Sequence, residues 1–149
     1  MIKWFGLHRG FTLVELTILL AGGMVLILLA VPALATVERQ WSLWGGACQV
    51  ESTLQWGRLY AISANTSLRF EVDARGESFW WTDSETGAKF AATVRRLPKG
   101  VRINSAPAQP LRFFPRGNAA PAGSYAVGSS AGTWRIVVNL AGRIRMEKL

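Results

Sequence analysis

Cysteine and histidine are nearly absent from the 149-residue sequence, which contains one of each. Because Cys48 is the only cysteine, no intrachain disulfide can form, and cysteine usage does not indicate a redox compartment. A zinc site would have to combine Cys48 with carboxylates alone, and no spacing of such residues suggests one. The only histidine, His8, precedes a long apolar run. The sequence therefore gives no support for a metal centre or a disulfide framework.

Acidic residues are also scarce, with nine Asp and Glu against 17 Lys and Arg, and the formal net charge is +8. This excess favours an anionic partner, and charge alone leaves nucleic acid, acidic lipid headgroups and an acidic protein surface open. Asp83 and Glu85 are paired carboxylates in a predicted surface loop, where turn residues are expected rather than acid–base catalysts. The glycine-rich residues 116–123 lack the Lys-Ser/Thr pair of a phosphate-binding loop.

One long apolar run dominates the N-terminal part of the chain. Residues 11–37, 27 in all, contain Glu15 as their only charged residue. About 20 apolar residues suffice to cross a bilayer, and a carboxylate at depth costs roughly 2.5–3.5 kcal/mol. The run fits a cleaved secretory signal, with an A-x-A-like site at residues 33–35, or a signal anchor that keeps Lys3 and Arg9 in the cytoplasm. Neither interpretation explains Glu15.

The segment RGFTLVEL, residues 9–16, resembles the type III signal of type IV pilins and pseudopilins. The resemblance implies that a prepilin peptidase cuts between Gly10 and Phe11, and that the new N-terminal Phe11 is N-methylated. It also implies that Glu15 is an assembly residue, facing the N-terminal amine of a neighbouring Phe11 in the filament. Pro32 lies where many members have a proline that bends the stem. The alternative for Glu15 is an acid tolerated near the membrane surface.

Cleavage after Gly10 would remove His8, and with it the only histidine. Ser-His-Asp and Cys-His arrangements would then be impossible. We therefore expect no catalytic residues, no metal and no cofactor.

After the apolar run, residues 38–65 are expected to continue the same helix in amphipathic form. Leu43, Ala47, Val50, Leu54 and Ala61 recur at helical spacing, which predicts a stripe that packs under a globular head. The helix should end near residue 65, where the pattern breaks. The tryptophans at positions 41 and 44 lie near the stripe, and they fit either the core or an aromatic belt at a membrane surface.

From residue 66 onward the period changes to two. Leu68, Phe70 and Val72 alternate with charged residues, which predicts a half-buried strand. Residues 74–77 should form a turn into a hairpin partner. The expected strands are 68–72, 78–82, 90–97, 101–104, 111–114, 124–127, 133–139 and 142–146, where 90–97 and 101–104 form a strand pair or one interrupted strand.

The predicted fold class is α+β, with a long N-terminal helix packed on an antiparallel β-sheet or sandwich head of pilin-like form. The helix would have a transmembrane half over 11–37 and an amphipathic half over 38–65. Residues 1–10 would be a leader peptide, and residues 66–149 a β-rich periplasmic head. The head resembles the GspH/FimT group of minor pseudopilins in the segments GRLYAI (57–62), LPKGV (97–101), FPRG (114–117) and VVNLAGRIR (137–145).

That resemblance implies a non-enzymatic structural subunit in the inner membrane. It would pass the membrane once, with the N-terminus in the cytoplasm and the head in the periplasm, and enter a filament after assembly. The implied partners are other pilin or pseudopilin subunits, the prepilin peptidase and the inner-membrane assembly platform. Two systems remain open, type IV pilus biogenesis and initiation of a type II secretion pseudopilus. A membrane-anchored binding module outside any filament is the alternative from another class.

Basic residues form two clusters in the sequence. Arg143 and Arg145 alternate and should share one face of a strand, and Arg135 and Lys148 lie in the same C-terminal hairpin. The segment GRIR, residues 142–145, matches the terminal Gly-Arg-x-Arg that in the FimT-like branch is associated with DNA capture. DNA is therefore a candidate partner, and a solvated edge or contacts with neighbouring subunits are the alternatives. The second cluster comprises Arg95, Arg96, Lys99 and Arg102.

Overall fold

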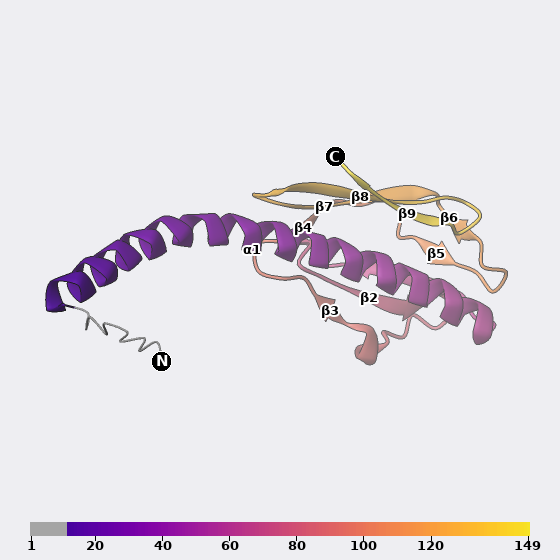
Figure 1. Ribbon diagram of the computed structural model, residues 1–149. Helices are drawn as coiled ribbons and strands as arrows, with labels where there is room; N and C mark the ends of the chain where they lie inside the picture. Colours follow the sequence, from indigo (N-terminus) through magenta and orange to yellow (C-terminus); the bar gives the residue numbers. More distant parts are fainter. Residues whose placement is uncertain (1–11) are drawn as a thin grey trace, which may run out of the picture. The chain divides into compact units, whose positions relative to one another are not determined.

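The computed structural model describes residues 12–149, and for residues 29–33 it describes the backbone without the side chains. A single long helix, α1 (Leu13–Ser63), precedes a series of short strands (Figure 1). The chain divides into two compact units, Met1–Val37 and Glu38–Leu149, and each is described by itself. The strands are β1 (Leu68–Val72), β2 (Ser78–Asp83), β3 (Arg95–Arg96), β4 (Arg102–Ser105), β5 (Arg112–Phe113), β6 (Ala119–Ala120), β7 (Gly123–Ser129), β8 (Gly132–Val138) and β9 (Ile144–Lys148).

In the first unit, the described residues from Leu13 onward are helical and their apolar side chains are mostly exposed. The helical backbone continues through Pro32. Within the part of the chain that the structure describes, no helix has both the length and the apolar character required to span a membrane. The predicted leader, residues 1–10, lies outside the described residues, as do Phe11 and five side chains of the predicted span over 11–37.

The second unit contains two antiparallel sheets. One has the strand order β3-β2-β1-β5-β6, and the other has the order β4-β7-β8-β9. The hairpin expected between residues 68–72 and 78–82 is confirmed, because β1 pairs with β2 with Phe70 opposite Trp81. The C-terminal hairpin is also confirmed as β8 and β9. The last strand begins at Ile144 rather than at residue 142, because Gly142 has a φ of 74° and belongs to the turn.

The core lies between the helix and the two sheets. All five residues of the predicted helical stripe are buried, so this prediction is confirmed. Phe70 of β1 contacts Tyr125 of β7 edge-on, with 5.4 Å between ring centroids, which joins the two sheets in one core. The buried hydrophobic residues are Leu43, Ala47, Val50, Leu54, Ala61, Leu68, Phe70, Phe79, Trp81, Leu97, Val101, Ile103, Leu111, Phe113, Ala119, Tyr125, Val127, Ile136 and Val138.

The end of α1 agrees with the prediction to within two residues. Asn65 adopts a left-handed conformation with a φ of 49°. The Thr66 N–H donates to the carbonyl of Ala61 at 3.1 Å, and the Asn65 N–H donates to that of Ile62 at 3.4 Å. These two bonds form a Schellman motif, in which Asn replaces the usual glycine and satisfies carbonyls at the helix end.

The prediction for residues 90–104 is wrong in two respects. Only Arg95–Arg96 forms a strand in residues 90–97, because Ala91–Thr93 forms a 3-10 turn, η1. The Thr93 hydroxyl accepts a hydrogen bond from the backbone N–H of Trp81 at 3.0 Å, so a side chain takes the place of a strand partner. The following strand, β4, pairs with β7 in the other sheet, so residues 90–97 and 101–104 are not a strand pair. The sequence also gave no indication of β6.

Gly57 and Gly45 provide a test of this packing. A Cβ at Gly57 would clash with the buried indole of Trp81, whereas a Cβ at Gly45 would meet nothing within 4 Å. We expect Gly57→Ala to destabilise the head by about 2–3 kcal/mol through overpacking. The matched control Gly45→Ala should stabilise it by about 0.5–1 kcal/mol, because alanine favours the helix. Urea unfolding of fragment 38–149 measures both, and equal effects at the two positions would contradict this packing.

Candidate functional site

The first candidate site is the start of α1. The predicted cleavage residues, Gly10 and Phe11, lie outside the described residues, but Thr12 and Glu15 are described. The backbone N–H and the hydroxyl of Thr12 both donate to Oε2 of Glu15 at 2.9 Å, and the Glu15 N–H donates to the Thr12 hydroxyl at 3.2 Å. This reciprocal pair is a capping box, with Thr12 at the N-cap and Glu15 three residues later. Glu15 therefore has a local role at the start of its own helix that the sequence analysis missed, although the spacing Thr-x-x-Glu carries its signal.

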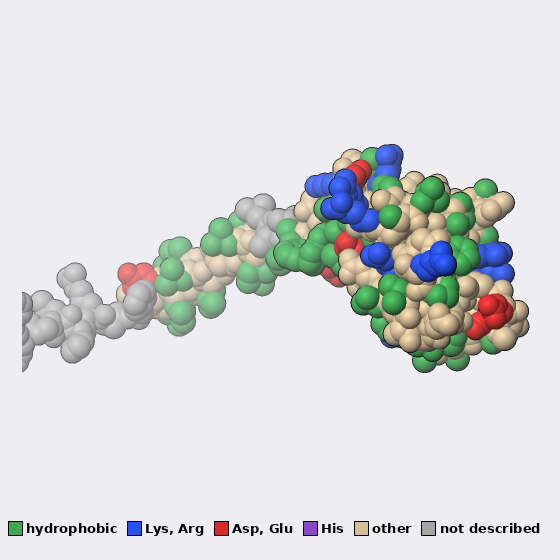
Figure 2. Space-filling view, turned by 90° about the vertical axis from the view of Figure 1, so that its right-hand side faces the viewer, with side chains coloured by type: hydrophobic (Ala, Val, Ile, Leu, Met, Phe, Trp, Pro, Cys, Tyr) green, Lys and Arg blue, Asp and Glu red, His purple; other side chains and the backbone are tan. Residues whose placement is uncertain are grey.

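The second candidate site is the outer face of the β4-β7-β8-β9 sheet, the face turned away from the core. Ile144 and Met146 of β9 pack against the core, so Arg145, which alternates with them, lies on the outer face. Arg135 of β8 shares this face, because it alternates with buried Ile136 and lies opposite Glu147. Arg143 is also exposed, two residues before Arg145. Figure 2 shows several Lys and Arg side chains gathered at the upper edge of the head, with few Asp and Glu among them.

Lys148 lies in the same hairpin as these arginines, as expected, but on the opposite face of it. In β9 it alternates with Glu147 and lies opposite Trp134 of β8. It lines a cleft with Trp41, Trp44 and Trp134, on the side of the sheet that faces α1. The period of two along a strand separates Lys148 from Arg145 even though the two are only three residues apart.

Of the mid-domain basic cluster, Arg96, Lys99 and Arg102 line one hollow of about 870 Å³ together with Glu77, whereas Arg95 lines a different pocket. Arg96 pairs with Glu77 at 3.2 Å. The guanidinium of Arg95 donates to the carbonyls of Ala92 at 3.3 Å and Val94 at 3.4 Å. Arg102 alternates with buried Ile103 in β4 and therefore also lies on the outer face of the β4-β7-β8-β9 sheet, on the edge strand opposite β9.

Three of the short head segments noted in the sequence meet at Arg58. Its Nε donates to the carbonyl of Gly117 at 2.9 Å, and one terminal nitrogen donates to that of Ala141 at 3.3 Å. A Cβ at Gly142 would clash with the Gly117 carbonyl, so this approach requires glycine. The segments 57–62, 114–117 and 137–145 therefore join the end of α1 to both sheets, which is a structural role rather than a ligand site.

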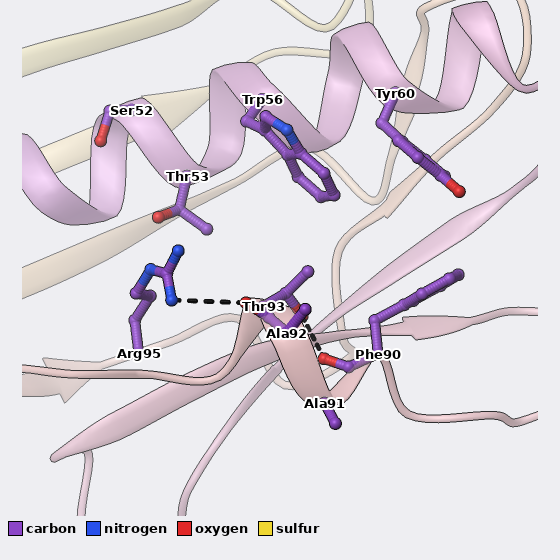
Figure 3. A pocket seen from close by; sticks show the side chains of 9 residues that line it. All are labelled: Ser52, Thr53, Trp56, Tyr60, Phe90, Ala91, Ala92, Thr93 and Arg95. Carbon is purple, nitrogen blue, oxygen red and sulfur yellow. Dashed lines mark hydrogen bonds between the residues drawn. The ribbon is translucent and has the colours of Figure 1, made fainter.

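A pocket of about 620 Å³ lies between α1 and the 3-10 turn η1 (Figure 3). Trp56 and Tyr60 stack with 5.0 Å between ring centroids, and Tyr60 meets Phe90 edge-on at 5.9 Å. The Thr53 hydroxyl donates to the Gln49 carbonyl at 2.8 Å. The guanidinium of Arg95, at the rim of the pocket, donates to the carbonyl of Ala92. Because both polar groups bond to nearby carbonyls, the pocket presents mainly aromatic surface. Sequence reasoning missed it because its walls come from segments about 30 residues apart.

Asp83 is the last residue of β2 rather than a loop residue, and its side chain caps the turn that follows. Its Oδ1 accepts hydrogen bonds from the backbone N–H groups of Glu85 at 2.8 Å and Thr86 at 2.9 Å. These bonds to the charged form, that from Thr86 above all, hold the pKa of Asp83 below its usual value. In the described residues, no group of three or more His, Cys, Asp and Glu side chains is placed to hold a metal ion.

In the second unit, a helix packed on two antiparallel sheets defines a pilin-like α+β fold. The chain belongs to the GspH family, because the sequence profile described as "Type II transport protein GspH" matches residues 47–142, more than half of its length. The resemblance seen in the head segments is thereby confirmed, and so is the α+β fold class.

Solved structures give the same fold. The type IV minor pilin FimU of Pseudomonas aeruginosa has a TM-score of 0.60 and 20% identity, over 72% of this chain and 90% of that chain. The minor pseudopilin EpsH from the type 2 secretion system of Vibrio cholerae has a TM-score of 0.57 and 15% identity, over 68% of this chain and 93% of that chain. At these identities the likeness shows the fold alone. A search of curated protein sequences finds no match.

Removing the Arg58 side chain tests its structural role. We expect Arg58→Ala to destabilise the head by about 1–3 kcal/mol, because two carbonyls lose a charged donor. Arg116→Ala is the matched control, since this exposed arginine lies next to Gly117 in the same loop and should change stability by less than about 0.5 kcal/mol. Thermal unfolding of fragment 38–149 checks both. Unchanged stability of Arg58→Ala would show that the two hydrogen bonds are dispensable.

Proposed function

We propose that this chain is a minor pilin or pseudopilin, a non-enzymatic subunit that enters or primes a type IV pilus or a type II secretion pseudopilus. The observation that carries the proposal is the family match over residues 47–142, which lies entirely within the unit Glu38–Leu149. The pilin-like segment RGFTLVEL precedes that unit at the start of the apolar run.

In this proposal, the prepilin peptidase cuts between Gly10 and Phe11, and the new N-terminal Phe11 is methylated. Residues 11–37 hold the subunit in the inner membrane, with the head in the periplasm, until the assembly platform transfers it to the filament. The support for insertion is the sequence, whose 27 residues over 11–37 include one charge.

Glu15 has two roles in the proposed assembly cycle. Within one subunit it accepts both Thr12 hydrogen bonds on Oε2. A carboxylate has two oxygens, so Oε1 is available for a further donor. In the filament, that donor is the N-terminal amine of a neighbouring Phe11. A shifted register would leave a carboxylate and an amine unpaired among apolar helices, a cost of about 3–5 kcal/mol, so the pair selects the register.

Two substitutions separate these roles. Glu15→Gln keeps the capping box, because glutamine serves at the same position, but it removes the charge. Thr12→Ala keeps the charge and weakens the cap by about 0.5–2 kcal/mol. We expect Glu15→Gln to be cleaved but nearly absent from filaments, and Thr12→Ala to be incorporated. Immunoblots of sheared filaments and membrane fractions measure both steps.

Normal incorporation of Glu15→Gln would sink the pairing role of Glu15. Exclusion of Thr12→Ala, with normal cleavage, would instead show that the helix cap is the property that assembly needs. Cleavage of either variant reports on the peptidase alone, because that step precedes assembly.

Binding of DNA is a second candidate function. It is favoured by three arginines of the β8–β9 hairpin: Arg135 and Arg145 lie on the outer face of the strands, and Arg143 is exposed in the turn between them. Guanidinium groups can bond two phosphate oxygens at once. In this proposal the outer face lies against the backbone of a DNA duplex, without base contacts, as part of DNA uptake through a type IV pilus.

The matched control for this candidate is Lys148, a basic residue of the same hairpin on the opposite face. We expect the double variant Arg143→Ala and Arg145→Ala to weaken duplex binding and to reduce the slope of log K against log salt by about 2. Lys148→Ala should leave the slope unchanged. Fluorescence anisotropy at 50–200 mM salt, a range chosen for its effect on phosphate contacts, measures this. No binding by the parent protein at low salt would remove the DNA candidate.

A further inference from the structure

The end of the head at which the unit Glu38–Leu149 begins carries two exposed tryptophans, Trp41 and Trp44, beside a third, Trp134, which is half-buried against the core. Trp41 is 65% exposed and Trp44 is 46% exposed, although Leu43 between them is buried. The two rings meet edge-on, with 5.8 Å between centroids. Together with Trp134 and Lys148 they line a cleft of about 410 Å³. The sequence left a core stripe and an aromatic belt open for Trp41 and Trp44, and their exposure excludes the core.

This end of the head also carries four basic side chains. Together with the tryptophans they form what we call the basal surface, which comprises Arg39, Trp41, Trp44, Lys99, Arg102, Trp134 and Lys148. Two contacts place the loop before β4 and the β7–β8 hairpin beside the first turns of the helix in this unit. A Cβ at Gly46 would meet Val101 and Pro98, and a Cβ at Gly132 would meet Leu43. All four cations are exposed.

Acidic side chains near the basal surface are fewer and partly neutralised. Glu38 is exposed beside Arg39 on the helix. Glu77 is paired with Arg96 at 3.2 Å, and Glu147 lies opposite Arg135. The surface therefore combines indole rings with an excess of positive charge.

We propose that the basal surface binds anionic phospholipid headgroups. Tryptophan rings favour the membrane–water interface, where the apolar ring is partly buried and the indole N–H stays wet. A cationic side chain near an anionic leaflet contributes attraction, and a lysine can lie along an apolar surface while its ammonium reaches outward. Lys148 lies opposite Trp134 and fits this arrangement. The inference rests on the proposed function, since residues 11–37 directly precede the surface.

Binding to the lipid surface would give the subunit a second attachment besides its apolar segment. The head would be held against the membrane until extraction, when the tryptophans and cations would leave the headgroups together. Strength of this attachment would depend on ionic strength, because exposed charges are screened within about 8–10 Å at physiological salt.

Co-sedimentation with vesicles tests the proposal. Fragment 38–149 suits this test because it contains the whole core and the whole family match. We expect it to bind vesicles of phosphatidylcholine with phosphatidylglycerol, and to bind vesicles of phosphatidylcholine alone about tenfold or more weakly. The double variant Trp41→Ala and Trp44→Ala, and the double variant Lys99→Ala and Arg102→Ala, should each weaken binding by about tenfold.

Two matched controls lie outside the basal surface. Trp56, which is 43% exposed, is a similarly accessible tryptophan on the same helix, and Trp56→Ala should leave vesicle binding unchanged. The double variant Arg112→Ala and Arg116→Ala removes the same charge as the lysine–arginine variant from two exposed arginines of β5 and the loop that follows it. It should also bind as the parent fragment does. Circular dichroism verifies that all variants are folded.

The proposal is overturned if the fragment does not bind anionic vesicles, or if the Trp41 and Trp44 changes have no more effect than Trp56→Ala. Self-association of the fragment that is lost on the same changes, without vesicle binding, would make this surface a protein interface instead. Carbonate extraction of the full chain tests the membrane anchor separately. Because the fragment lacks residues 11–37, its vesicle binding and the anchor can fail independently.

Discussion

The head depends on the close approach of α1 to the indole of Trp81. This approach is possible because residue 57 is glycine, and a methyl group there would clash with the ring. The ring of Trp81 lies 5.0 Å from that of Phe70 and 5.9 Å from that of Phe113, measured between centroids. The ring of Phe70 in turn contacts Tyr125 in the other sheet. The position of the helix and the alignment of both sheets are therefore set through one aromatic cluster. Because protein interiors are close-packed, a shift of one ring in this cluster would displace its neighbours.

Near the C-terminal end of the helix, Arg58 supplements this apolar packing with polar bonds. The carbonyls of Gly117 and Ala141 belong to loops of different sheets, and the guanidinium of Arg58 donates a hydrogen bond to each. The two contacts differ in kind. Trp81 sets a distance through excluded volume, whereas Arg58 sets an orientation through its planar fork of donors. Short segments that look like scattered motifs in the sequence are thus parts of one junction, and their family resemblance reflects folding.

Charge in this chain is arranged by strand parity and by the helix end. Glu15 caps its own helix through Thr12 and still has one oxygen free of Thr12 bonds. Arg145 and Lys148 lie on opposite faces of β9, so the basic hairpin divides into an outer arginine face and a lysine beside three tryptophans. An excess of positive charge therefore does not define one surface. It defines two, which suit different anionic partners.

The amino-acid sequence by itself determined the helical stripe, the β1–β2 hairpin, the position of the helix end and the family of the chain. These features follow from local periodicity and short motifs, which report burial within one element. Only the tertiary structure decided that residues 95–96 and 102–105 enter different sheets, that Lys148 leaves the arginine face, and that Arg58 joins three distant segments. Strand partners and the meeting of loops depend on contacts between residues far apart in the chain, and no local pattern specifies them.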